Sequence, residues 1–216
     1  MAEAPTLDRM GRQAVESVQR PDGPVRIVEK GNPVTVTDPN SPLRGKVVEV
    51  VERVENGSAD QFLARQGGQM TSGQARAFDA ACKEFNRNGY AWLDNHTGNY
   101  GFERIPNTED GWRVVVLDPG GIVPMRGATL AERAENARAI QSRVNLPTED
   151  FSSSMGFVKN PKVRKMVAGE QWGKILDECG SMIDIDSMGL HSPTDVGFYP
   201  GGLLDFPEAQ KLFRTP

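Results

Sequence analysis

The sequence is poor in the residues that most often carry metal or redox chemistry. It has only two cysteines, Cys82 and Cys179, and two histidines, His96 and His191. The cysteines lie far apart and have no metal-ligand spacing, so we expect two free thiols in a reducing compartment. A zinc site or a disulfide-stapled scaffold is therefore excluded as an interpretation.

Long apolar runs and a strong charge of one sign are also absent. No run approaches the length of a membrane span, and the opening MAEAPTLDRM has no apolar core, so we expect neither a membrane helix nor a Sec-type signal peptide. A net charge of -4 argues against a general nucleic-acid binder. We expect a globular protein that is cytoplasmic, or is delivered into a target cell without such a signal.

The first third of the chain predicts one helix and three strands. Apolar residues at helical spacing indicate a helix over 6–19. Two short β-like runs, 25–29 and 33–37, are separated by Lys-Gly-Asn, which we interpret as a hairpin turn. The run 46–54 is mostly apolar, which is typical of a central strand.

The rest of the chain predicts helices around a second hairpin. Helices are expected over 71–89, 129–144 and 160–179, the second opened by the capping box of Thr129 and Glu132. Two strands, 100–104 and 112–118, flank a turn-rich segment. The order of these elements predicts an α+β fold with segregated parts rather than alternating βαβ units.

The segment WLDNHTGN, residues 92–99, gathers polar residues just before this second hairpin. Asn99 enters its first strand and Asp118 leaves its second, so the two should converge at one end, with Asp94 nearby. Carboxylate and amide oxygens are the ligands that Mg²⁺ prefers. Pro-Gly-Gly after Asp118 would let a bulky substrate approach. A plain turn built from polar residues is the alternative interpretation.

The pattern Asp94-x-His96-x-Gly98-Asn99, followed by Asp118-Pro-Gly after the apolar run VVVL, resembles the catalytic core of the protein-kinase-like superfamily. It is most similar to the aminoglycoside and choline phosphotransferase branch. The resemblance implies Asp94 as the base that positions an acceptor hydroxyl, and His96 as the histidine of the catalytic loop that braces the metal-binding Asp. It implies Asn99 and Asp118 as ligands of the Mg²⁺ that accompanies ATP.

The same resemblance implies a two-lobed kinase-like fold. Residues 1–54 would form a reduced N-lobe and hinge, and residues 55–216 a mainly helical C-lobe, with the metal-binding segment at 112–121. Backbone groups of Glu52 to Val54 would meet adenine.

The sequence departs from this family in the segments that bind the phosphates of ATP. It has no G-x-G-x-x-G loop and no V-A-I-K-type lysine; Lys30 is the nearest. Helix 6–19 would occupy the place of the helix that carries the carboxylate partner of the family's lysine. Glu16 is a candidate for that partner, although we expect it on a solvated face of the helix. The first three N-lobe strands would then be lost, or supplied by a partner or an upstream segment.

Three functions are compatible with these residues. The first is an ATP- and Mg²⁺-dependent phosphotransferase acting on a protein or small-molecule hydroxyl, similar to bacterial effector or toxin kinases. The second is a pseudokinase-like module, or a kinase fragment, that binds without catalysis. The third, a metallophosphoesterase, is suggested by the Asp-x-His pair but ranks low because that chemistry needs more histidines than the chain has.

Overall fold

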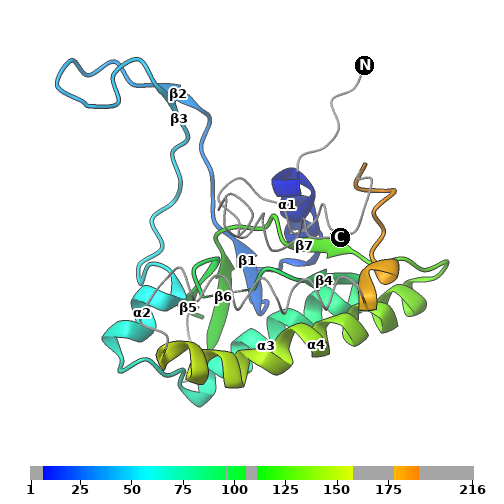
Figure 1. Ribbon diagram of the computed structural model, residues 1–216. Helices are drawn as coiled ribbons and strands as arrows, with labels where there is room; N and C mark the ends of the chain where they lie inside the picture. Colours follow the sequence, from blue (N-terminus) through cyan, green and yellow to red (C-terminus); the bar gives the residue numbers. More distant parts are fainter. Residues whose placement is uncertain (1–6, 96, 106–110, 158–177, 190–216) are drawn as a thin grey trace, which may run out of the picture.

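The computed structural model describes residues 7–95, 97–105, 111–157 and 178–189 as a mixed α+β structure (Figure 1). The α+β class predicted from the order of elements is confirmed. The helices of the described residues are α1 (Leu7–Val18), α2 (Ala59–Arg65), α3 (Ser72–Arg87), α4 (Leu130–Phe157) and the short 3₁₀ helix η1 (Gly180–Met182).

The strands form three small sheets. The largest has the order β1-β6-β5, with β1 (Val25–Ile27) parallel to β6 (Trp112–Val116) and β5 (Tyr100–Arg104) antiparallel to β6. A second pairs β4 (Tyr90–Trp92) with β7 (Ile122–Pro124), antiparallel. The third pairs β2 (Val34–Thr35) with β3 (Val47–Val48). The predicted hairpin of residues 100–118 is thus present as β5 and β6.

Local sequence signals at both ends of helix α3 set where it begins and ends. Thr71 and Gln74 form a complete capping box at its start, and Gly89 follows its end with a φ of 78°, a conformation that glycine adopts without steric cost. Its buried side chains include Ala77, Ala81 and Phe85, at helical spacing. The helix predicted over 71–89 is confirmed, and its apolar face points at the strands.

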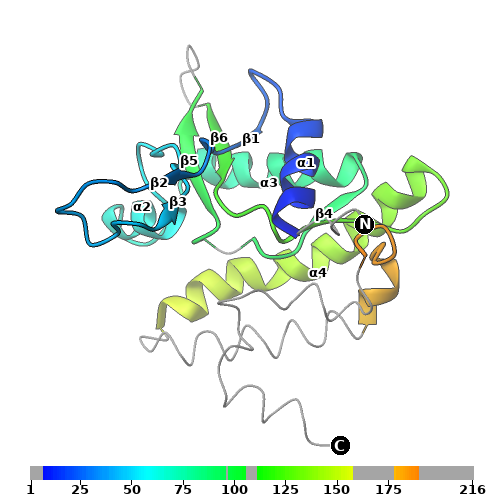
Figure 2. The same cartoon turned by 90° about the horizontal axis from the view of Figure 1, so that it is seen from above.

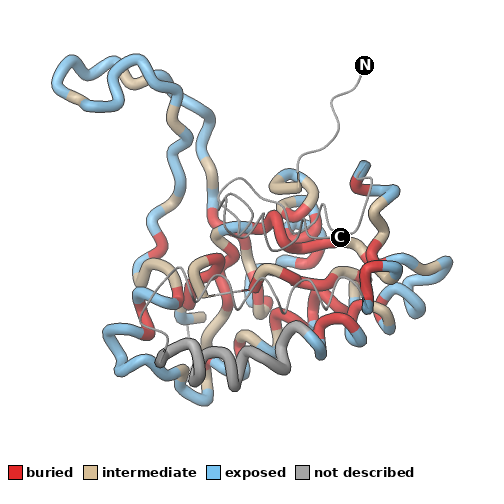
Figure 3. The backbone as a smooth tube through the Cα atoms, in the orientation of Figure 1, coloured by how far each residue is buried: buried red, intermediate tan, exposed pale blue. Residues whose placement is uncertain are grey.

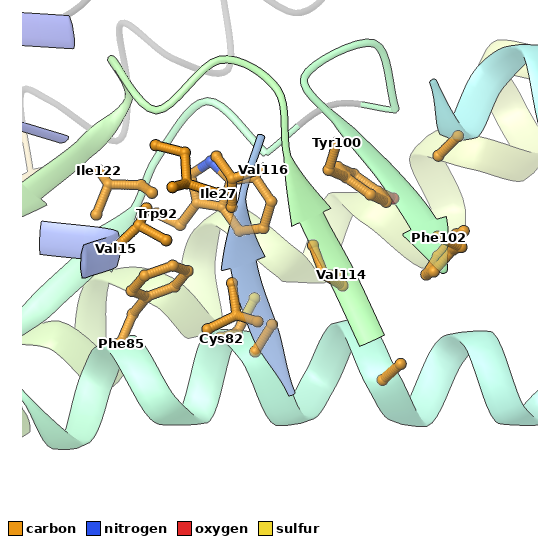
Figure 4. Packing of buried hydrophobic residues seen from close by; sticks show 14 of the residues in the cluster. Val15, Ile27, Cys82, Phe85, Trp92, Tyr100, Phe102, Val114, Val116 and Ile122 are labelled. Atoms are coloured by element: carbon orange, nitrogen blue, oxygen red, sulfur yellow. The ribbon is translucent and has the colours of Figure 1, made fainter. Parts of the chain in front are cut away.

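The largest of three hydrophobic clusters in the described residues joins α1, α2 and α3 to the strands (Figure 4). At its centre lie Trp92 and Tyr100, whose rings meet edge to face with centroids 5.5 Å apart, and Phe85 packs against Trp92 in the same way at 5.8 Å. Such aromatic pairs add roughly 0.5–1.5 kcal/mol each beyond their buried area. These aromatics fix the two ends of the segment 93–99, because Trp92 precedes it and Tyr100 follows it.

The helices cover the strands from two sides. Helices α3 and α4 lie side by side and both pack on β4, α3 also packs on β6, and α1 packs on β1 and β7 (Figures 1 and 2). Both α1 and β1 contribute to the cluster that holds Trp92. The predicted division into lobes at residue 54 stays a prediction, and α1 and β1 share one core with the hairpin β5–β6.

The prediction of strands between residues 25 and 54 is partly wrong. Lys-Gly-Asn is not a hairpin turn: β1 pairs with β6, and Lys30 and Gly31 run alongside Val50 and Val51 into a projecting arm, residues 31–51. The run 46–54 is not a central strand, because only Val47–Val48 is extended and Val47 is 69% exposed. Figure 3 shows the arm as largely exposed.

Further along, the capping box of Thr129 and Glu132 is confirmed. Glu132 N–H donates to Thr129 Oγ1 at 3.2 Å, and Thr129 N–H donates to Glu132 Oε2 at 3.3 Å. The helix that it opens is longer than predicted and runs to Phe157. Most of the helix predicted over 160–179 lies outside the described residues.

Candidate functional site

The end of strand β4 is held by one buried side chain. Gln141 of α4 accepts from the Trp92 N–H at 2.8 Å and donates its Nε2–H to the Trp92 carbonyl at 3.0 Å. Both residues are buried. Because the amide matches both backbone groups, it substitutes for a neighbouring strand. Gln141 thereby fixes the point at which the segment 93–99 leaves the sheet.

Asp94 comes two residues after this fixed point and lies against the glycine pair that follows Asp118. The Leu93 N–H donates to the Gly121 carbonyl at 2.7 Å. A Cβ at Gly121 would stand 2.4 Å from the Asp94 Cβ and 2.7 Å from its backbone nitrogen. Only a glycine allows this approach. Asp94 is half-buried, and it can occupy this position because residue 121 is a glycine and has no side chain.

Asn99 closes the loop and joins it to Asp118. Its Nδ2–H donates to the Asp94 carbonyl at 3.0 Å. Its own carbonyl accepts from the Leu117 N–H at 2.8 Å and the Asp118 N–H at 3.1 Å. These bonds bring together the backbones of all three polar residues named from the sequence. Among the described residues no hydrogen bond to Asn99 Oδ1 is found, so that oxygen can serve a ligand.

Asp118 follows β6 at the surface. Its Oδ1 accepts from the Gly120 N–H at 3.1 Å, which is an Asx-type turn. The carboxylate is exposed, whereas Asn99 is only 8% exposed. One carboxylate oxygen is thus oriented by the backbone and the second is open to solvent.

Amide and carboxylate oxygens such as those of Asn99 and Asp118 suit a hard cation such as Mg²⁺. In the part of the chain that is described, no three His, Cys, Asp or Glu residues form a group that could hold a metal. A magnesium ion here would therefore bind through Asp118, the Asn99 amide and water or phosphate oxygens. His96, predicted to brace the metal-binding Asp, lies outside the described residues.

A hollow of about 650 Å³ lies next to this site. It is bordered by Leu117, which directly precedes Asp118, and by the segment predicted to meet adenine. The Glu52 N–H is already bonded to the Glu29 carbonyl at 2.8 Å, and the Val54 carbonyl accepts from Gly57 at 2.9 Å. The lining residues are Glu52 to Ser58, Gln61, Arg65 and Leu117.

The Glu52 carboxylate belongs to an ion-pair network rather than to the hollow. Arg26 donates to both oxygens of Glu52 at 2.8 Å and also pairs with Glu103, which pairs in turn with Arg113. The hydrogen bonds from Arg26 hold the pKa of Glu52 below its usual value. Burial acts to raise the pKa of Glu103, but hydrogen bonds from Arg26 and Arg113 outweigh it and lower that pKa. Any adenine contact at Glu52 must therefore be made by its backbone.

The chain matches no family model, no curated protein and no solved structure. None of the helices in the described residues is long and apolar enough to cross a membrane.

Lys30 pairs with carboxylates other than Glu16. Glu16 is exposed on α1, and it is Asp8, two turns earlier on the helix, that lies 3.3 Å from Lys30 Nζ; Glu49 lies at the same distance. The expectation that Glu16 lies on a solvated face of the helix is confirmed, and the face of α1 toward Lys30 carries Asp8 and Arg12, four residues apart. That spacing was present in the sequence as a signal.

Sequence reasoning also missed Gln141. It falls at helical spacing with Ala137 and Ile140, and all three are buried. A glutamine in the apolar stripe of a helix needs a buried partner. The pattern therefore carried a signal for a buried hydrogen bond, although nothing in it named Trp92.

Proposed function

We propose that the chain is an ATP- and Mg²⁺-dependent phosphotransferase with a kinase-like catalytic core. The observation that carries the proposal is the order α3, β4, loop 93–99, β5, β6, Asp118 and β7, in which β4 and β7 pair so that Asp94 and Asn99 meet Asp118. The hollow beside Leu117 offers a place for the adenine ring of ATP, next to the residues proposed to hold the metal and the phosphates.

In this proposal each polar residue has one task. Asp94 accepts the proton of the acceptor hydroxyl, and the oxygen of that hydroxyl forms a bond to the γ-phosphorus of ATP. The bond between the γ-phosphorus and the bridging oxygen breaks, and ADP leaves with that oxygen. Asn99 and Asp118 hold Mg²⁺, which, when bound, offsets charge on the phosphates. Gly121 and Gln141 keep Asp94 in position through the contacts described above.

The test is release of ADP from ATP, with water or the chain's own hydroxyl groups as acceptor. Asp94→Asn keeps the side-chain size but cannot take a proton, so turnover should fall about 100-fold or more while ATP affinity is kept. Asp79→Asn, on the exposed face of α3, is the matched control and should keep full turnover. Equal turnover in Asp94→Asn and the control would overturn the role of Asp94.

A second candidate function is nucleotide binding without transfer. The lack of a G-x-G-x-x-G loop in the sequence favours it, because that loop normally covers the phosphates during transfer. ATP binding that depends on Asp118, together with no ADP release under any condition tested, would select this function over the phosphotransferase.

A further inference from the structure

Helix α1 touches the segment that follows Asp118. A Cβ at Gly11 would stand 1.8 Å from the Pro119 carbonyl oxygen, so the helix backbone lies directly on that peptide. Gly11 is buried, and its neighbour Arg12 is half-buried. This turn of α1 therefore packs on the segment that follows Asp118, one of the residues proposed to hold the metal.

The Arg12 guanidinium reaches the carboxyl ends of two parallel strands. Its Nη1–H donates to the Val28 carbonyl at 3.3 Å, and the Val28 N–H donates to the Val116 carbonyl at 3.0 Å. Val28 directly follows β1 and Val116 ends β6, two residues before Asp118. Ligands of parallel sheets bind at this edge.

Arg12 also lacks the counter-charge that other cations of this region possess. Lys30 has both Asp8 and Glu49 within 3.3 Å. Arg12 forms no ion pair with any described residue, and its Nη2 is buried without a hydrogen-bond partner among them. A guanidinium taken from water without an anion is costly, and phosphate is the anion whose geometry it matches best.

We propose that Arg12 is the phosphate-binding cation of this site and contacts the polyphosphate of the nucleotide. The inference rests on the proposed function and supplies the positive charge that the sequence left unassigned. It places that charge on α1, the helix that packs on Pro119, rather than on a strand lysine. Lys30, neutralised by two carboxylates, would then act as a positioning residue between α1 and the arm.

The experiment is a calorimetric titration of Mg·ATP, magnesium tripolyphosphate and adenosine into the full chain and its variants. Arg12→Gln should weaken binding of Mg·ATP and tripolyphosphate roughly 10- to 100-fold, the range of a charged hydrogen bond, and leave adenosine unchanged. Arg12→Lys, which keeps the charge, should recover part of the loss. Arg20→Gln removes the same charge from an exposed position and is the control.

The melting temperature without ligand separates this role from a structural one. Arg12→Gln should melt no lower than Arg20→Gln, because a buried charge without an anion stabilises little. Equal Mg·ATP affinity in the wild type and Arg12→Gln, whatever the melting temperature of the variant, would overturn the inference while the proposed function stands. A wild-type chain that binds neither Mg·ATP nor adenosine would instead contradict the proposed function itself.

Discussion

Gly11 and Gly121 are among the glycines at which any side chain would collide with backbone. Gly11 meets Pro119 and Gly121 meets Asp94, each with less room than a Cβ needs. Both contacts bear on the segment that carries Asp118. The positions of the proposed catalytic residues thus depend on glycine at positions 11 and 121 as much as on the polar side chains themselves.

Gly11→Ala should therefore separate α1 from the segment 118–121. Alanine raises intrinsic helix propensity, which alone would stabilise α1 by up to about 1 kcal/mol. The clash with the Pro119 carbonyl acts in the opposite direction by roughly 1–3 kcal/mol, so we expect net destabilisation. Denaturant unfolding measures the difference. Gln13→Ala, exposed on the same helix, is the control, and a Gly11→Ala chain as stable as that control would contradict the close contact.

Gln141→Leu should lower the free energy of unfolding by about 2–4 kcal/mol. It leaves both the N–H and the carbonyl of Trp92 buried without a partner, and each such group costs roughly 1–3 kcal/mol. Ser142→Ala, at the exposed neighbouring position, should change stability little. Gln141→Glu is a sharper test, since its carboxylate still accepts from the N–H but repels the carbonyl, so a stability equal to wild type would refute the described pair.

At the scale of elements, the arm of residues 31–51 stands apart from the core. None of its residues belongs to the three buried clusters of the described chain, and an isolated two-stranded hairpin is marginal in water. Its ends are already joined by the Gly31 N–H bond to the Val50 carbonyl at 2.7 Å. The arm therefore adds little to the stability of the core.

Replacing residues 33–48 with a short Gly-Ser turn should consequently leave the melting temperature within a few degrees of wild type. The Lys30–Glu49 contact can persist, since both residues remain. A scanning-calorimetry transition that broadens or vanishes in the shortened chain would show that the arm is part of the cooperative core, against this description.

Local signals in the sequence predicted elements better than pairings between them. Helix α3 and the start of α4 were predictable because Thr71, Gln74, Thr129 and Glu132 act on their own neighbours. The partner of β1 was not predictable: β1 pairs with β6, more than 80 residues away, and nothing near Lys-Gly-Asn reveals that. The candidate site was predictable as a hairpin end, whereas Gln141 and Arg12 reach it from distant helices.

At the scale of the whole molecule, the network of Arg26, Glu52, Glu103 and Arg113 ties β1 and the segment beside the hollow to the hairpin β5–β6. The folded-state pKa values of both glutamates lie below their usual value of 4.5. Their contribution to stability is therefore complete above about pH 4.5 and is lost as the pH falls through the folded-state pKa values.

Arg26→Met should reduce the free energy of unfolding by roughly 2 kcal/mol at pH 7, since it removes hydrogen bonds between charged groups. The variant should also lose less stability on acidification than the wild type, because its glutamates keep more ordinary pKa values. Urea unfolding at pH 7 and at pH 3.5 measures both effects. The same loss on acidification in the two proteins would contradict a role for this network in acid stability.

The central claim is that Asp94, Asn99 and Asp118 form a site for Mg²⁺ and nucleotide. The most direct measurement is a titration of ATP into the chain with Mg²⁺ and with EDTA, beside Asp118→Asn. We expect ATP binding that needs Mg²⁺ and is lost in Asp118→Asn, with a stabilisation of the wild type of roughly 2.7 kcal/mol at 100 times the Kd. Magnesium-independent binding, or the same affinity in Asp118→Asn, would contradict it.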